Sequence, residues 1–126
     1  MFMTKEEVLN SIEYQINLMH PRTSGEDVLS DLTLTLRPIL LNERQALNGA
    51  LRDYLSFRIR KEGRYPTDYI SEARIWMALG LAEALNLTEL IPDVERLLVD
   101  VKKGRIFLPI YTEMIEKQLN NMRKKT

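Results

Sequence analysis

Apolar residues recur along most of this chain at the three- and four-residue spacing of amphipathic helices. One stretch departs from that spacing: residues 75–82 are apolar without interruption, between Arg74 and Glu83. A helix that is apolar on every side must be covered by other helices, so this stretch predicts a central, buried helix. It is too short to cross a bilayer, which requires about 20 apolar residues.

Capping and breaking residues divide the pattern into six predicted helices. Thr4 and Glu7 form a capping box, and Asn86 is typical of a helix end. The predicted helices cover about residues 4–18, 25–36, 42–63, 67–86, 90–103 and 109–123, with either Thr67 or Ser71 as the cap of the fourth. Residues 31–36 also alternate as a strand would, but no partner strand is predicted elsewhere. The predicted fold class is a single all-α domain over residues 1–126, arranged as a bundle or an antiparallel helix stack.

Composition agrees with one folded domain. The chain has 126 residues, of which 44% are hydrophobic, so it is long enough and apolar enough to bury a core. Cysteine is absent, which excludes disulfides and fits a reducing compartment. The first residues resemble neither a secretory signal nor a lipidation motif, and we expect a cytoplasmic location.

The net charge is zero, but the charges are unevenly distributed along the chain. The net charge is −4 over residues 1–36, +4 over 37–64, −5 over 65–100 and +5 over 101–126. These blocks predict local fields of both signs, unless opposite blocks lie side by side and cancel.

Few residues suit catalysis or metal binding. There is no cysteine nucleophile, no Gly-x-Ser-x-Gly motif and no glycine-rich phosphate loop. His20 is the only histidine, which excludes a histidine-rich metal site within one chain. Next to Pro21, it is expected to interact with carbonyls at a helix end. The sequence therefore predicts that the chain is not an enzyme and that it binds neither a metal ion nor a cofactor.

Basic residues close to tyrosines indicate one possible function, nucleic-acid binding, because phosphates attract cations and bases stack on aromatic rings. The first basic group is Arg58, Arg60, Lys61 and Arg64, near Tyr65 and Tyr69; the second is Lys102, Lys103 and Arg105. A sequence pI of about 6.6 argues against this function. We keep it as the alternative.

Acidic residues in the third charge block predict a different surface. On a helical wheel, three of them project outward from the fifth predicted helix and two more lie on the fourth. They are Glu89, Asp93 and Asp100, with Glu72 and Glu83. Such a face suits a basic protein partner, with affinity from buried aromatics such as Tyr65, Tyr69 and Tyr111. A solvated helix exterior without a partner is the other interpretation.

Two resemblances bear on this choice. Residues 72–85, rich in alanine, resemble the first helix of a HEAT-like repeat, and residues 90–100, with Pro92 in an early turn and Asp100 near the end, resemble the second. No second copy follows at a period of about 40 residues. This resemblance implies an antiparallel helix pair, in a class of proteins used mainly to bind other proteins.

In size, helical class, lack of cysteine and charge blocks, the chain is also similar to small helical toxin-immunity proteins of bacteria, including those of contact-dependent growth inhibition. That similarity implies binding to the C-terminal domain of a cognate toxin, expected to be a nuclease, in the cytoplasm. The acidic residues named above would then contact the toxin. No membrane partner is expected, and the oligomeric state stays open.

Overall fold

The computed structural model describes residues 4–18, 25–56, 69–103 and 112–124, which form helices and no strand within these ranges. The elements are α1 (Lys5–Leu18), α2 (Gly25–Leu36), η1 (Arg37–Ile39), α3 (Leu40–Leu55), α4 (Tyr69–Ala84), η2 (Thr88–Leu90), α5 (Ile91–Lys102) and α6 (Thr112–Lys124), where η marks a short 3-10 helix. The all-α prediction is confirmed. Residues 25–36 are helical, so the strand alternative is wrong.

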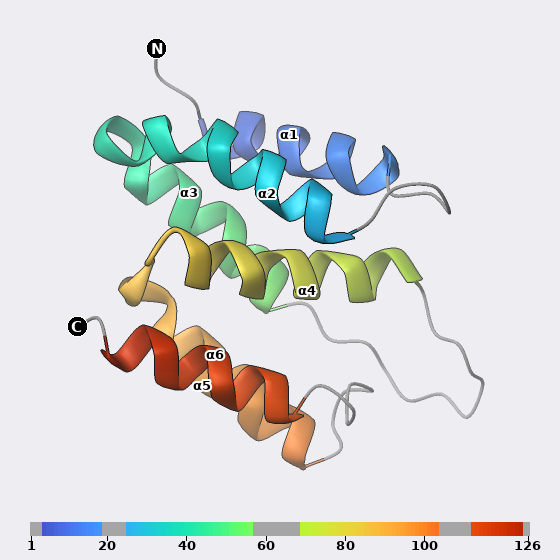
Figure 1. Ribbon diagram of the computed structural model, residues 1–126, viewed down its shortest axis with the longest axis vertical. Coiled ribbons are helices and arrows are strands. Elements are labelled where there is room, and N and C mark those ends of the chain that lie inside the picture. The colour runs from blue at the N-terminus through green and yellow to red at the C-terminus, as the bar shows by residue number, and fades with distance from the viewer. Residues whose placement is uncertain (1–3, 19–24, 57–68, 104–111, 125–126) are drawn as a thin grey trace.

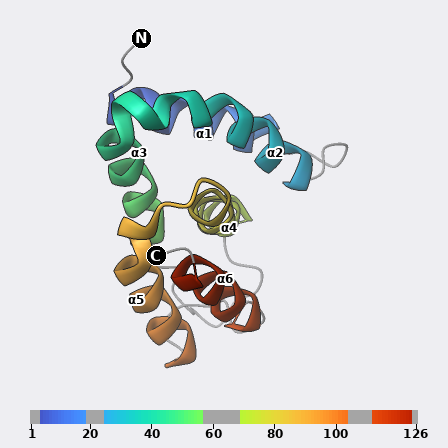
Figure 2. The same cartoon turned by 60° about the vertical axis from the view of Figure 1, so that its left-hand side comes forward.

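The helices form three layers along the long axis of the molecule. The antiparallel pair α1 and α2 forms the first layer, α3 and α4 the second, and the antiparallel pair α5 and α6 the third (Figure 1). One row of helices packs α1 on α3 and α3 on α5; the other packs α2 on α4 and α4 on α6. Figure 2 shows α4 end-on between the first and third layers. The segments that resemble a HEAT-like repeat fall on α4 and α5, which pack mainly along α3 and α6 respectively.

α4 is the buried centre that its sequence predicts. Ile75 and all residues from Met77 to Ala82 are buried, while Trp76 is partly buried against the core. Helices α1, α2, α3 and α6 all pack against α4. Gly80 allows a close approach to α2, because a Cβ atom there would lie 2.8 Å from Leu29 Cδ2.

The surrounding helices bury one stripe each at helical spacing, which supplies the rest of the core. These residues are Val8 and Ile12 on α1, Val28, Leu32 and Leu36 on α2, Leu47, Leu51 and Leu55 on α3, Val94, Leu97 and Val101 on α5, and Ile115, Leu119 and Met122 on α6.

Two predicted caps are confirmed. Thr4 Oγ1 accepts a hydrogen bond from the Glu7 amide at 3.2 Å, and Glu7 Oε1 accepts one from the Thr4 amide at 3.3 Å. After α4, Asn86 has a φ of 57°, the left-handed conformation that ends many helices. The amides of Asn86 and Leu87 then donate to the carbonyls of Glu83 and Ala82, which completes a Schellman motif.

The boundaries of α3 differ from the prediction. The helix begins at Leu40, and the predicted start at Asn42 falls beside a kink at Glu43, whose φ of −134° and ψ of 38° are not helical. It ends at Leu55, well before Gly63. The predicted end at Gly104 and the predicted start near Pro109 lie outside the described residues. Within the described residues, no helix is long and apolar enough to cross a membrane.

Candidate functional site

Two of the five acidic residues predicted to face a partner, Glu89 and Asp93, form ion pairs within the molecule. Glu89, in η2, binds the guanidinium of Arg44 on α3: Arg44 Nη2 donates to Glu89 Oε1 at 2.7 Å, and Arg44 Nε donates to Glu89 Oε2. Asn48 Nδ2 donates to the same carboxylate at 2.9 Å. The hydrogen bond from Arg44 is the main reason that the pKa of Glu89 falls to about 2. Glu89 is exposed, as predicted, but it already has a cationic partner.

The position of Asp93 differs from the predicted one more than that of Glu89 does. It was expected to project outward, yet only 6% of the residue is exposed. Its carboxylate lies 3.2 Å from Arg52 Nε on α3 and 3.6 Å from Arg96 Nη1 one turn farther along α5. It also lies in the first turn of α5, where the helix dipole favours a negative charge. Asp93 therefore joins α5 to α3 and is not available to a partner.

These contacts form one continuous row of polar pairs between α3 and the η2–α5 segment. Arg44, Asn48 and Arg52 follow each other at four-residue spacing on α3, and Glu89 and Asp93 have the same spacing on the η2–α5 segment. Residues four apart lie on one helix face, so the complementary pairs meet in register. This matching of charge at equal spacing was visible in the sequence and could have indicated an internal contact.

The other predicted site residues are scattered or undescribed. Glu83 and Asp100 are half-buried on α4 and α5. Lys102, from the second basic group, lies 2.7 Å from Glu116 on α6, and Lys103 is exposed. The remaining predicted residues, or their side chains, lie outside what the structure describes: Glu72, Tyr65, Tyr69, Tyr111, Arg58, Arg60, Lys61, Arg64, Arg105 and His20.

Among the described helices, the largest net charge lies in the first layer. Together α1 and α2 carry six acidic residues and one basic residue, a net charge of −5. The exposed acids are Glu6, Glu7, Asp27 and Asp31. Among described residues, no ion pair involves Glu6, Asp27 or Asp31. Each of the other two layers has a net helix charge between −1 and 0, so the first layer has the most acidic of the described helices.

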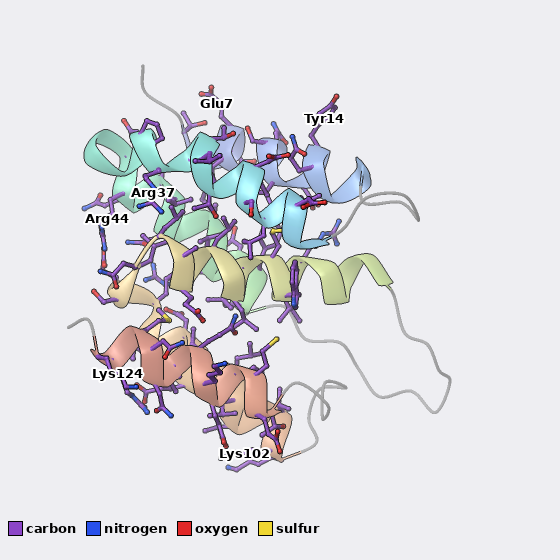
Figure 3. All side chains as sticks on the ribbon, in the orientation of Figure 1. Glu7, Tyr14, Arg37, Arg44, Lys102 and Lys124 are labelled. Carbon is purple, nitrogen blue, oxygen red and sulfur yellow. The ribbon has the colours of Figure 1, made fainter. Side chains whose placement is uncertain are left out.

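Two large apolar side chains are exposed on the same pair of helices. Tyr14 on α1 is 65% exposed and Leu34 on α2 is 71% exposed. Figure 3 shows Glu7 and Tyr14 pointing away from the body of the molecule, at the end opposite Lys102 and Lys124. We call the exposed surface of these two helices, with its four acids, Tyr14 and Leu34, the α1–α2 face. Tyrosine is enriched among the residues that contribute most to protein–protein binding.

Sequence reasoning missed the α1–α2 face because its acids have a second explanation. Glu6, Glu7 and Asp27 lie in the first turns of their helices, where the dipole alone favours them. The better signal was the exposed spacing of Asn10 and Tyr14 after Glu7, on the side away from the buried residues.

An open depression of about 410 Å³ lies beside this face, where α1, α3 and α4 meet. Glu6, Asn10 and Glu13 line it from α1, Asp53 and Tyr54 from α3, and Arg74 from α4. The Tyr54 hydroxyl lies 3.5 Å from the Leu9 carbonyl, to which it donates. Burial, and then the charge of Glu13, raise the pKa of Tyr54.

No group of three or more histidine, cysteine or acidic side chains among the described residues has the geometry to hold a metal ion. Comparison with protein-family models, with curated proteins and with solved structures finds no match to this chain.

Proposed function

We propose that this chain is a non-catalytic protein-binding module that inhibits a basic protein partner. The observation that supports this most directly is the α1–α2 face, which combines a net helix charge of −5 with the exposed side chains of Tyr14 and Leu34. Complementary charge accelerates encounter and fixes the orientation of two proteins. Exposed aromatic and aliphatic groups then supply the buried contact area.

We propose further that the partner is the C-terminal domain of a bacterial toxin, and that the chain is its immunity protein. This step follows the similarity to immunity proteins of contact-dependent growth inhibition. A nuclease toxin binds phosphates and so requires a basic substrate groove. An acidic face could cover such a groove and block the substrate, and the encounter would take place in the cytoplasm of the producing cell.

Co-expression tests the proposal. The proposal predicts that a neighbouring gene encodes a large secreted protein, whose C-terminal domain would be the toxin to test. Expressed alone in a bacterial host, that domain should stop growth; expressed with this chain, it should not, and the two should purify as a complex. Growth arrest in the presence of folded, soluble chain would contradict the proposal.

Charge-reversed variants test the surface on which the proposal is based. Asp31→Lys reverses one exposed charge on α2, and we expect it to weaken the complex about tenfold, with a smaller effect at high salt. Glu113→Lys, which reverses an exposed charge on α6, is the matched control and should change the affinity little. Equal effects of the two variants would exclude the α1–α2 face.

A further inference from the structure

The depression beside α1 is already a place where carboxylates bind cations. Arg74 Nε lies 2.9 Å from Oε1 and 3.2 Å from Oε2 of Glu13. At its edge, Lys5 Nζ lies 2.8 Å from Asp53 Oδ2. The same small region therefore holds one guanidinium and one ammonium group of the chain itself.

These two ion pairs do not neutralise all of the negative charge in the depression. The lining carries three carboxylates, Glu6, Glu13 and Asp53, against the single guanidinium of Arg74. Even with Lys5 counted at the edge, acids outnumber bases. Within the described residues Glu6 has no cationic partner, and it is exposed at the point where the depression adjoins the α1–α2 face.

The lining also offers more than charge. Asn10 is exposed and its amide oxygen can accept a hydrogen bond. Leu9 and the almost fully buried Tyr54 supply apolar surface between the charged groups. A planar cation with several donors and a long apolar stem matches this combination better than a compact ammonium group does.

From these contacts we infer that the depression binds an arginine side chain of the protein partner, with the guanidinium on Glu6 and Asn10. Only the identification of the arginine's source as a protein depends on the proposed function. Docking of the partner on the α1–α2 face would place its basic surface next to this depression. The partner would then be held both by apolar contacts with Tyr14 and by the ion pair of its arginine in the depression.

An NMR titration tests the site without a partner. The probe is N-acetyl-arginine amide, and N-acetyl-citrulline amide serves as the neutral control of nearly the same shape. We expect the arginine probe to shift, in a saturable way, backbone amides of residues 6–13 and 53–54 and the side-chain amide of Asn10. The citrulline probe should not. Equal shifts with both probes, or shifts confined to α5 and α6, would overturn the inference.

Single-residue variants distinguish binding of the arginine probe in the depression from a general effect of the protein's charge. Glu6→Gln should weaken binding of the arginine probe about two- to fivefold, the size expected of one exposed charge pair. Glu113→Gln, the same exposed substitution on α6, should leave it unchanged. Arg74→Gln releases Glu13 and should tighten binding. Identical affinities for the Glu6 and Glu113 variants would overturn the inference.

The two proposals fail in distinguishable ways. If the arginine probe does not bind but co-expression still protects cells from the toxin domain, the arginine site is wrong and the inhibitory function stands. If the probe binds as expected but the chain neither binds the toxin domain nor protects cells, the site stands and the toxin-immunity function is wrong.

Discussion

At the scale of single residues, Asp93 is the one buried acid among the described residues. It is buried and faces Arg52 and Arg96. Asp93→Asn removes the charge with little change of shape, and we expect it to lower the free energy of unfolding by about 1–3 kcal/mol, because hydrogen bonds to charged groups are lost. Urea unfolding followed by circular dichroism measures this.

The control for Asp93 lies two residues away. Glu95 is exposed and its carboxylate lies 3.5 Å from Arg123 Nη2, a surface ion pair. Glu95→Gln should change the free energy of unfolding by less than about 1 kcal/mol. Equal losses for the two variants would show that Asp93 acts as a surface acid, as the sequence had suggested.

The lowered pKa of Glu89 predicts that the stability of the protein depends on pH. Arg44 lowers its pKa from 4.5 to about 2 in the folded protein, so its contribution to stability is present above about pH 4.5 and is lost as the pH falls toward 2. The pair is exposed, and solvent limits its contribution to about 1 kcal/mol or less. The difference in unfolding free energy between the wild type and Glu89→Gln should therefore shrink on acidification. A difference that is constant between about pH 6 and pH 2.5 would contradict this assignment.

At the scale of elements, the end of α4 depends on the left-handed conformation of Asn86. Asn86→Ala should lower the free energy of unfolding by about 1 kcal/mol, because a Cβ atom disfavours this conformation and alanine lacks the local hydrogen bonding of asparagine. Asn86→Gly should be neutral or stabilising. Thermal unfolding of both variants measures the difference, and a more stable alanine variant would exclude the Schellman motif.

Substitution by alanine should affect stability differently at two helical glycines, Gly49 on α3 and Gly80 on α4, because α2 packs closely on α4 at Gly80. A Cβ at Gly49 would make an ordinary 3.5 Å contact with Lys5 Cδ, so Gly49→Ala should stabilise the protein by about 0.5–1 kcal/mol through helix propensity. At Gly80 the same change moves Leu29, so the gain should be smaller or become a loss. Adding Leu29→Ala should restore the gain from Gly80→Ala. Equal stabilisation at both glycines in the wild-type background would contradict the close approach of α2 and α4.

Most of the elements could be predicted from local patterns, and the errors have local causes. Apolar spacing located the helices, and Thr4 and Asn86 marked the ends of two of them. The end of α3 was missed, because amphipathic spacing continued past Leu55. The outward assignment of Asp93 failed because a helical wheel treats one helix alone, whereas Arg52 reaches it from α3.

At the scale of the whole molecule, three layers separate the charges that the linear sequence only divides into blocks. Arg44 and Arg52, from the positive block over residues 37–64, pair with the acids Glu89 of η2 and Asp93 of α5. The third block is thus partly neutralised, while the first stays acidic. Which block keeps its charge depends on tertiary contacts, which the linear sequence does not show.

We propose that the α1–α2 face binds a basic protein. Hydrogen–deuterium exchange of the chain, alone and in complex with the toxin domain, tests it most directly. We predict slower exchange in α1 and α2 and in the residues of α3 around Asp53 and Tyr54, with little change in α5 and α6. Slower exchange confined to α5 and α6 would contradict the claim.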